Sequence, residues 1–560
     1  MPKNIIICSD GTGNTAIKGR GTNVFKIFES VDLNSHRFHP ERSPQVAIYD
    51  DGVGTESFKL LRILGGAAGY GLSRNVRQLY KELCRIYDPG DRIFLFGFSR
   101  GAFTVRSLSG FIGTCGIIDI SRLGSSATLD ALVEDAYERY RECYRTWLMR
   151  MLIGKPDPRH TQEFRERHCY GGEKIHFIGV WDTVDAVGLP LHVSDLVNRF
   201  IYQFKFPDLV MSSCVERAVH ALAIDDERQS FHPLIWDERA PLRPGQSLEQ
   251  VWFAGVHSNV GGGYPKQGMS LVALDWIMHK AEVAGLRFID VEREYYRVHE
   301  NVDDKLYDPR SGLGKFYRWL PRNVAHLCEC SGMRPKVHLS VLERIAHGTE
   351  NYSPGNLPVN AEIVITPTGD VAKDASARAR ALGVQAVLHG AHLQGRSLLD
   401  GVRKYVHLGR FAYRILVLTL VATLLLAAYG RREQSEGFPH ALLELLGSLI
   451  FDPLKTAADL FWRRADSLQL VAVLLVGLVS AAVLSRWSTH GIHKVFDGFW
   501  FTHQQKLRDA LKQARIQSGG DHPPSGVMVR DQKQYAHDEK DRGGDGVDQL
   551  HGQLLRGDLT

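Results

Sequence analysis

The segment 91–101 constrains this chain most, because an apolar run typical of a buried β-strand ends there in the pattern Gly-x-Ser-x-Gly. Ser99 is the central residue of the motif, and the helix-forming segment 102–112 follows at once. So tight a turn from strand to helix leaves no room for side chains beside the serine, and Gly97 and Gly101 supply none. The spacing therefore predicts a nucleophile elbow that projects the Ser99 hydroxyl from the top of a sheet.

Four further runs have the same character, a short apolar stretch followed by polar or glycine-rich residues. They span 5–8, 46–49, 175–181 and 250–256. Near-continuous apolar runs that alternate with helical segments are typical of a parallel sheet covered by helices on both faces. We therefore expect an α/β protein of the α/β-hydrolase type with a mostly parallel sheet, whose ligands bind beyond the carboxyl ends of the strands.

Ser99, Asp182 and His257 each follow directly after one of these strands, in the order serine, aspartate, histidine that α/β-hydrolases use. A serine hydroxyl needs a base that accepts its proton, and the base needs a third group that fixes its tautomer. We predict Ser99 as the nucleophile and Nε2 of His257 as the general base and then the general acid. Asp182 would accept a hydrogen bond from Nδ1 of the same ring.

Two parts of the predicted site stay open. For the oxyanion, the expected donors are the backbone N–H of Arg100 and the turn at Gly11 and Thr12, whose strand would end on the same face of the sheet. Arg100 could instead pair with an acid or meet a phosphate headgroup. For the triad acid, other aspartates compete with Asp182, because an aspartate after a strand is often only a helix cap. They are Asp185, Asp225 and Asp226.

Composition excludes several classes of protein. With 560 residues, 44% of them hydrophobic, the chain can bury a substantial core. A net charge of +5 with no dense basic block argues against a nucleic-acid partner. The eight cysteines lack the spacing of a metal site or a disulfide framework, so we expect no metal and no other cofactor. The first residues lack a signal sequence, which predicts synthesis in the cytoplasm.

The chain divides by composition into three regions. Residues 1–365 carry the strands and form the expected catalytic domain, in which the charged segments 121–170 and 186–245 are expected to be helical insertions that cap the site. Residues 366–515 are predicted to form a helical, membrane-associating region. The tail 516–560 is polar and has no apolar period, so we expect it to be disordered.

Two long apolar stretches lie in the second region, at about 411–430 and 468–486, and arginines flank both. A helix of about 20 residues spans the 30 Å hydrocarbon core of a bilayer, and flanking arginines are typical of helices that end at a membrane surface. We therefore predict a pair of transmembrane-like helices. The alternative is a pair of buried helices in a globular domain.

Four blocks of residues resemble the signature of a known family. They are Ser-Asp-Gly-Thr-Gly-Asn at 9–14, Gly-Phe-Ser-Arg-Gly-Ala at 97–102, Gly-Val-Trp-Asp-Thr-Val at 179–184 and Gly-Val-His-Ser-Asn-Val-Gly-Gly-Gly-Tyr at 255–264. In this order they are similar to a bacterial α/β-hydrolase family, formerly of unknown function, that includes type VI secretion phospholipase effectors. The resemblance covers about residues 3–360 and implies hydrolysis of phospholipid esters, of the A1 or A2 type, by Ser99, Asp182 and His257. Asn259 departs from the family pattern, which usually has an aspartate there.

We therefore predict a serine hydrolase of the lipase or phospholipase type that acts at a membrane on a phospholipid or another acyl ester. A membrane-anchored esterase or thioesterase of housekeeping role and a non-catalytic scaffold of the same fold are the alternatives. A phosphotransfer protein fits poorly, because the turn after Asp10 lacks the second aspartate of an aspartyl-phosphate site. For an effector, the expected partners are a secretion spike, an adaptor or an immunity protein, and the expected destination is a target cell.

Overall fold

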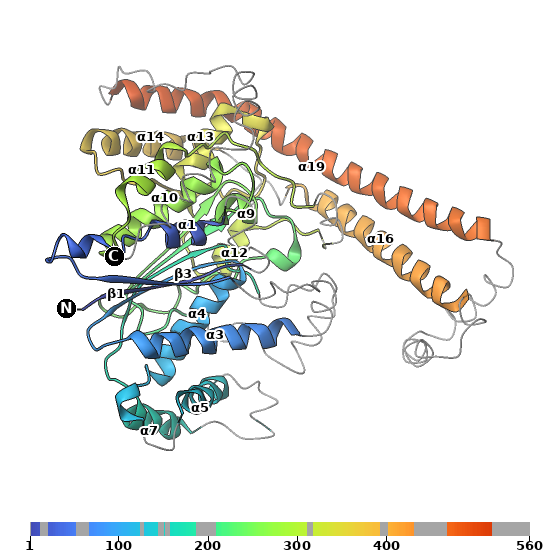
Figure 1. Cartoon of the computed structure of the whole chain (residues 1–560). Helices are drawn as coiled ribbons and strands as arrows, with labels where there is room; N and C mark the ends of the chain where they lie inside the picture. The colour runs from blue at the N-terminus through green and yellow to red at the C-terminus, as the bar shows by residue number, and fades with distance from the viewer. Residues whose placement is uncertain are drawn as a thin grey trace, which may run out of the picture.

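In the computed structural model the described residues form an α/β protein in which all named strands belong to one sheet (Figure 1). The structure describes the whole chain except residues 1, 12–20, 52–66, 124–127, 144–150, 152–156, 186–208, 311–316, 318, 392–400, 431–466 and 518–560. Almost all of the tail for which disorder is predicted, 516–560, lies outside the described residues.

The sheet has eight strands, all parallel, in the order β2-β1-β3-β4-β5-β6-β7-β8. The strands are β1 (Asn4–Ser9), β2 (Gln45–Asp50), β3 (Arg92–Phe98), β4 (Ile175–Trp181), β5 (Arg217–Ala223), β6 (Ser247–Phe253), β7 (Lys336–His338) and β8 (Glu362–Val364). The predicted α/β class with a parallel sheet is thus confirmed.

Helices cover both faces of the sheet. The helices of the described residues are α1 (Asn23–Ser30), α3 (Ala67–Ile86), α4 (Arg100–Cys115), α5 (Leu129–Glu142), α7 (Pro158–His168), α9 (His257–Gly261), α10 (Gly268–Val283), α11 (Asp290–Val298), α12 (Val324–Ser331), α13 (Leu339–His347), α14 (Val371–His389), α16 (Arg403–Gly430) and α19 (Ser467–Gln517). In Figure 1, α3 and α4 lie on one side of β1 and β3, and α1 and α10 lie on the other.

The side chains of β1 alternate between two hydrophobic clusters, one on each face of the sheet, which explains why its sequence is continuously apolar. Ile5 and Ile7 belong to the hydrophobic cluster on the side of α3 and α4, whereas Ile6 and Cys8 belong to the cluster on the side of α1 and α10. Successive side chains of a strand point to opposite faces, so a strand that is buried on both faces needs apolar residues at every position.

The strand order changes direction between β1 and β3, which makes this pair the topological switch point of the sheet. The chain runs from β1 to β2 on one side of the sheet and then returns to β3 on the other side of β1. Connections that leave two adjacent strands in opposite directions open a crevice beyond their carboxyl ends, and ligands of open α/β sheets bind there. Gly11 follows β1 and Ser99 follows β3, so both flank this position.

One central strand is not expected from the sequence. β5 lies within 186–245, for which helical insertions are predicted, yet it pairs with β4 on one side and β6 on the other. Its sequence, Arg-Ala-Val-His-Ala-Leu-Ala, contains three alanines and a single β-branched residue. Alanine favours helices over strands, so local propensity pointed away from the structure that tertiary packing imposes.

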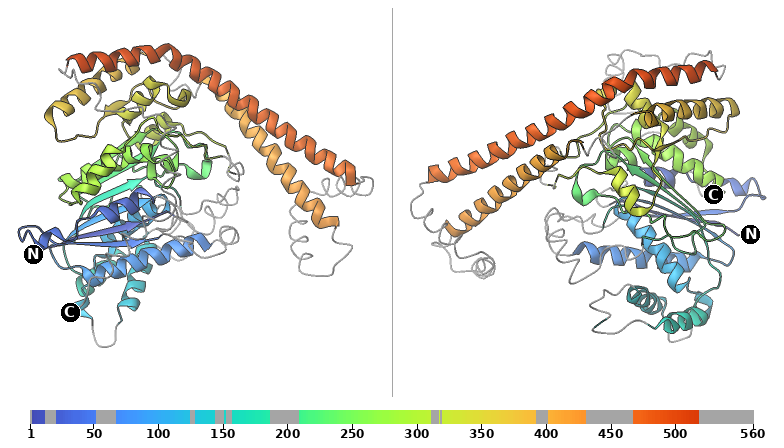
Figure 2. Two further views of the ribbon diagram at one scale, coloured as in Figure 1. Left: turned by 45° about the horizontal axis from the view of Figure 1, so that its top comes forward. Right: turned by 180° about the vertical axis from the view of Figure 1, so that it is seen from behind.

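The last helices pack on the sheet through the C-terminal half of α19. Trp500, Leu507 and Leu511 of α19 are buried in one hydrophobic cluster with Leu342 of α13 and Val384 of α14. The N-terminal half of α19 runs beside α16, and the pair extends away from the body as an arm (Figure 2). The sheet and α19 therefore contribute to the same hydrophobic core, although the predicted domain boundary near residue 365 lies between them in the sequence.

The prediction of a transmembrane hairpin needs correction. Both apolar stretches fold as helices, in α16 and in the first part of α19. Within the described ranges, however, none of the helices has the combination of length and hydropathy that crossing a bilayer requires. The first turns of α16 are interrupted by charge, at Arg403, Lys404, Arg410 and Arg414.

Replacing Trp500 by alanine tests whether α19 is part of the core. Trp500 is 4% exposed and its Nε1 donates to the carbonyl of Pro354 at 2.8 Å, so Trp500→Ala should lower the free energy of unfolding by about 3–5 kcal/mol. Its neighbour Phe501 is 82% exposed, and Phe501→Ala should change the free energy of unfolding by less than about 0.5 kcal/mol. Urea denaturation of the full chain measures both, and equal losses would contradict the shared core.

Candidate active site

Ser99 lies at the tip of a sharp turn between β3 and α4. Its backbone has φ 59° and ψ −120°, and such a conformation costs a non-glycine residue about 1–3 kcal/mol. The flanking glycines are required by packing, since a Cβ at Gly97 would lie 2.6 Å from Cα of Ala102 and one at Gly101 would collide with the carbonyl of Ser9. The predicted elbow is therefore present, with the serine between the strand and the first turn of the helix.

Asp182 occupies the matching position at the end of the neighbouring strand. β3 and β4 pair so that Phe98 faces Trp181, and the N–H of Ser99 donates to the carbonyl of Trp181 at 3.1 Å. Asp182 also has positive φ, 39°. Of the four non-glycine residues with positive φ in the described part of the chain, two are thus Ser99 and Asp182. Such strain persists where the surrounding structure over-determines it, and it clusters at active sites.

His257 is brought to Asp182 at the start of α9. Its Nδ1 lies 2.6 Å from Oδ2 of Asp182. The imidazole packs against the rings of Phe98 and Phe231, with centroid distances of 4.6 and 5.0 Å. Its buried Nε2 makes no hydrogen bond with the residues that the structure describes, so the bond to Oγ of Ser99 is not formed here. In enzymes without substrate such bonds are often long, and they tighten when substrate binds.

Arg322, which no sequence pattern predicted, is a further partner of Asp182. Its guanidinium binds the carboxylate with both Nη atoms, Nη1 to Oδ1 at 2.7 Å and Nη2 to Oδ2 at 2.8 Å. Both side chains are fully buried. The same guanidinium donates to the carbonyls of Ala223 and Phe231, and the N–H of Ala223 donates to Oδ1 at 3.0 Å. No motif surrounds Arg322, and 140 residues separate it from its partner.

These contacts determine the charge of each group. Burial alone would raise the pKa of Asp182, but the charge of Arg322 and the hydrogen bonds from Arg322 and His257 hold it well below its usual range. Burial lowers the pKa of His257, and the neighbouring Asp182 opposes this. The site at neutral pH therefore holds an ionised aspartate and a neutral imidazole, which is the state a general base requires.

The three alternative acids do not contact the ring nitrogens of His257. Asp185 lies three residues beyond Asp182, which itself holds Nδ1. Asp226 accepts from the backbone N–H of His257 at 3.2 Å and binds the guanidinium of Arg228 with both oxygens. The third, Asp225, accepts from the N–H of Gly255 at 2.6 Å and from the hydroxyl of Tyr352 at 2.8 Å.

The candidate oxyanion donors lie at the carboxyl ends of β1 and β3. Arg100 is the first residue of α4, so its backbone N–H belongs to the helix terminus beside Ser99. The N–H of Gly11 donates to Oδ1 of Asp10 at 2.6 Å, and it would have to leave that bond to serve an oxyanion. Thr12 lies outside the described residues.

Asp10 has a structural role at the carboxyl edge of the sheet, where its carboxylate accepts several hydrogen bonds. Its Oδ2 accepts from the hydroxyls of Thr22 and Tyr49, at 2.6 and 2.7 Å. With Oδ1 bound by Gly11, both oxygens are engaged, which does not suit a residue that would accept a phosphoryl group.

Asn259, the departure from the family pattern, has a structural role. Its amide donates to the carbonyl of Lys305 at 3.0 Å, and its Oδ1 lies 3.4 Å from the backbone nitrogens of Val256 and Tyr307. A carboxylate could accept at this position but could not donate to Lys305.

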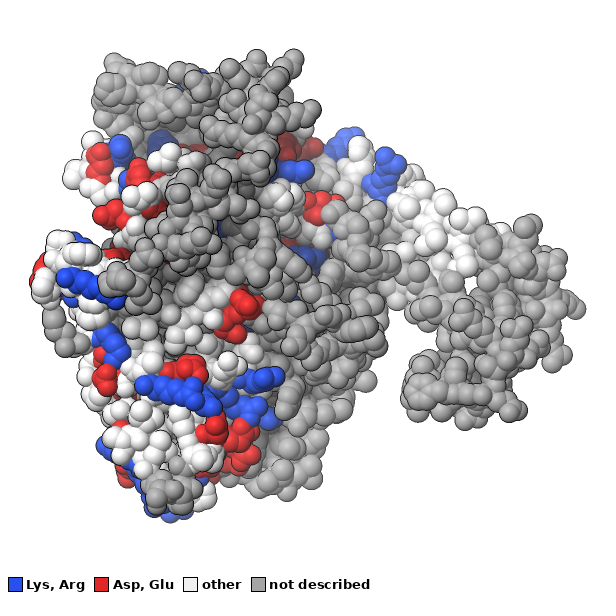
Figure 3. All heavy atoms as spheres, in the orientation of Figure 1, with Lys and Arg blue, Asp and Glu red and all other residues white. Residues whose placement is uncertain are grey.

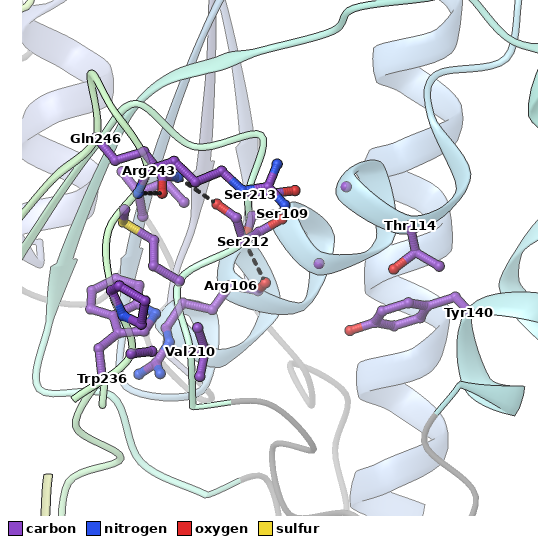
Figure 4. A pocket seen from close by; sticks show the side chains of 16 residues that line it. Arg106, Ser109, Thr114, Tyr140, Val210, Ser212, Ser213, Trp236, Arg243 and Gln246 are labelled. Carbon is purple, nitrogen blue, oxygen red and sulfur yellow. Dashed lines mark hydrogen bonds between the residues drawn. The ribbon is translucent and has the colours of Figure 1, made fainter. Parts of the chain in front are cut away.

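A separate cavity of about 450 Å³ lies along the later turns of α4 and contains none of the predicted catalytic side chains (Figure 4). Arg106, Trp236 and Ser212 are among its lining residues. The guanidinium of Arg106 stacks over the ring of Trp236 at 4.2 Å, and burial lowers its pKa to about 9.

These features define an α/β protein with one parallel sheet and a serine, a histidine and an aspartate gathered at its carboxyl edge. Residues 3–280, about half of the chain, match the family described as "T6SS, Phospholipase effector Tle1-like, catalytic domain". The chain therefore belongs to this family of phospholipase effector catalytic domains, which confirms the resemblance seen in the sequence. Arg322, β7, β8 and the C-terminal helices lie beyond the matched residues.

Two individual proteins are also similar to the chain. One is an uncharacterized protein of Saccharomyces cerevisiae, YEL023C, which is 29% identical over 248 residues, 41% of this chain and 32% of that protein. The chain thus spans about a third of the length of this relative. The other is a solved structure of an uncharacterized protein from Pseudomonas aeruginosa, with 18% identity and a TM-score of 0.32 over 70% of this chain and 60% of that one.

The environment of Asp225 predicts a pH-dependent stability. Burial raises the pKa of Asp225 from 3.8 to about 6, so the folded protein keeps this proton at pH values where the unfolded chain has lost it. The contribution of Asp225 should therefore fall as pH rises from about 4 to about 6, and Asp225→Asn should remove this slope. Thermal unfolding at several pH values compares the two proteins, and curves that run parallel would contradict the raised pKa.

Proposed function

We propose that the chain is a serine esterase that hydrolyses acyl ester bonds of phospholipids, with Ser99, His257 and Asp182 as its catalytic triad. The observation that carries the proposal is the pairing of a strained serine elbow with an imidazole whose Nδ1 is held 2.6 Å from a buried carboxylate at the next strand end. Membership in a phospholipase family supports a lipid substrate.

In the proposed first step, Oγ of Ser99 attacks the ester carbonyl carbon while Nε2 of His257 takes the hydroxyl proton. Asp182 holds the imidazole in the tautomer that has its proton on Nδ1, and it stabilises the imidazolium that forms. The guanidinium of Arg322 compensates the buried negative charge of Asp182, so the aspartate stays ionised in every step. The tetrahedral intermediate carries its negative charge on the former carbonyl oxygen.

The backbone N–H of Arg100 is the proposed donor to this oxyanion, aided by the positive end of the α4 dipole. Collapse of the intermediate breaks the ester C–O bond, and His257 gives its proton to the departing alcohol, a lysophospholipid. Water then attacks the acyl-serine with the same histidine as base, which releases a fatty acid and restores Ser99. Cleavage at either glycerol position, of A1 or A2 type, is compatible with these steps.

The arm suggests how the enzyme meets its substrate. Its outer surface exposes large apolar side chains, among them Leu475, Val479 and Trp487, which are 56%, 57% and 69% exposed. On the face in Figure 3 the described part of the arm is uncharged beyond the basic side chains near its base. Exposed apolar residues flanked by Arg414 and Arg486 suit a helix pair that enters one leaflet, with the arginines at the phosphates.

Labelling with a fluorophosphonate probe tests the triad directly. Attack by Oγ of Ser99 forms a P–O bond and expels fluoride, so wild-type protein should be labelled and Ser99→Ala should not. His257→Ala and Asp182→Asn should label slower by on the order of 10³- to 10⁴-fold, because the serine then lacks a correctly held base. Circular dichroism confirms that each variant is folded, and labelling that persists in Ser99→Ala would remove this serine from the mechanism.

Substrate class follows from a second readout on the same proteins. Release of fatty acid from phospholipid vesicles by wild type, absent in Ser99→Ala, supports the phospholipase. Hydrolysis of soluble esters or thioesters without action on vesicles would instead indicate the anchored esterase, and a folded wild type that is never labelled would indicate a non-catalytic scaffold.

Vesicle binding tests the arm. Val479→Glu and Leu475→Glu should each weaken binding to phospholipid vesicles by roughly tenfold or more, because an apolar side chain that enters the bilayer contributes at least 1.4 kcal/mol. Val371→Glu, on α14 and 85% exposed, is the matched control and should bind like wild type. Co-flotation with vesicles measures all three, and equal binding would show that this surface does not touch the membrane.

Family membership also motivates an effector role. Under this proposal the chain is delivered through a type VI secretion system to a target cell, and it meets a spike, an adaptor or an immunity protein. Growth arrest of a bacterium that produces the wild type in its periplasm, but not of one that produces Ser99→Ala, would support it.

A further inference from the structure

Arg322 is joined to the catalytic region by a short extended segment, 319–322. Trp319 forms an antiparallel bridge with Arg228, and the N–H of Leu320 donates to the carbonyl of Glu227 at 2.8 Å. Nε1 of Trp319 donates to the carboxylate of Glu227 at 2.9 Å. The segment therefore lies along the loop 225–228, whose Asp226 holds the backbone N–H of His257 (see above).

The other side of segment 319–322 faces the C-terminal helices. Trp319 is 3% exposed and is buried in one cluster with Val402, Val406, Ile492 and Phe496 from the base of the arm. The ring leaves so little space that a Cβ at Gly409 of α16 would lie 2.5 Å from it.

Glu227, which accepts from Trp319, is only partly buried, and it also pairs with Arg310, whose Nη1 lies 3.7 Å from its Oε2. Only two residues, Leu320 and Pro321, thus separate a tryptophan packed against the arm from an arginine that binds the proposed triad acid.

We propose that Arg322 is a positioning residue of the triad, and that packing of α16 and α19 against Trp319 holds Arg322 in place. The inference rests on the proposed function of Ser99, His257 and Asp182. In this arrangement the arm acts on catalysis through segment 319–322, in addition to any contact with a membrane. Detachment of the arm from Trp319 would loosen the ion pair that orients Asp182.

The effect of Arg322 on His257 has a definite sign. Both bind Oδ2 of Asp182, so the positive guanidinium lies close to the imidazole and disfavours imidazolium. Removal of the guanidinium should raise the pKa of His257 and shift the acidic limb of activity to higher pH. The other titratable and charged groups that face this cluster are kept in every variant: Asp225, Asp226, Arg228, His220 and His232.

The rate of fluorophosphonate labelling as a function of pH, measured on the full chain without vesicles, tests Arg322. Arg322→Gln should move the acidic limb up by about one pH unit or more, since a charge within about 6 Å shifts a pKa by one to three units. Arg322→Lys keeps the charge but not the two parallel hydrogen bonds, so its limb should return toward that of wild type while its rate stays lower. A slower Arg322→Gln with an unchanged limb would mean a purely structural role and would overturn the proposal.

Gly409→Ala tests the link to the arm without touching the ion pair. The new methyl group pushes the ring of Trp319, so the acidic limb should move in the same direction as in Arg322→Gln, by less. Gly498→Ala on α19 is the matched control, because no atom of the described residues lies within 4 Å of its Cβ position. Thermal unfolding reports the folding of each variant, and if the Arg322 variants do not fold, Gly409→Ala decides alone. A folded Gly409→Ala with the wild-type profile refutes the coupling, whereas a wild type that is not labelled refutes the triad itself.

Discussion

A carboxylate that is fully buried stays ionised only if hydrogen-bond donors replace the water it has lost, and Asp182 depends on this replacement. Its donors are Nδ1 of His257, the N–H of Ala223 and both Nη atoms of Arg322. They come from the start of α9, the end of β5 and a segment before α12. The site is therefore complete only when these three parts of the chain have packed around the end of β4.

The parallel sheet explains why such distant residues can meet. All strands end at one edge, so a residue placed directly after a strand lies near the residues placed after its neighbours. β1, β3, β4 and β5 are consecutive in the sheet, and Asp10, Ser99, Asp182 and Ile224 follow them directly. His257 follows β6, two strands beyond β4, and Asp182 reaches its ring across the end of β5.

Sequence patterns predicted the parts of the site that local chemistry specifies. Ser99, Asp182 and His257 each stand where an apolar run meets polar or glycine residues, so a strand end and its candidate catalytic side chain could be recognised together. The strand β5 was not predicted because its alanines carry no strand preference. The role of Arg322 was not predicted because its partner Asp182 is distant in sequence and no periodic pattern connects the two. The apolar stretches of α16 and α19 indicated removal from water, but hydropathy does not tell a bilayer from a protein core or an exposed helix face, and no helix among the described residues is long and apolar enough to cross a bilayer as predicted.

The ion pair between Asp182 and Arg322 is poorly explained as a source of stability. Replacement of a buried ion pair by apolar side chains is often neutral or favourable for folding, whereas loss of one partner leaves an uncompensated charge and is strongly destabilising. The carboxylate is required by the proposed chemistry, because a neutral residue at 182 would not stabilise an imidazolium at His257. Once that charge is buried, the arginine becomes necessary, and its attachment through Trp319 makes the helices beyond the sheet part of the same electrostatic unit.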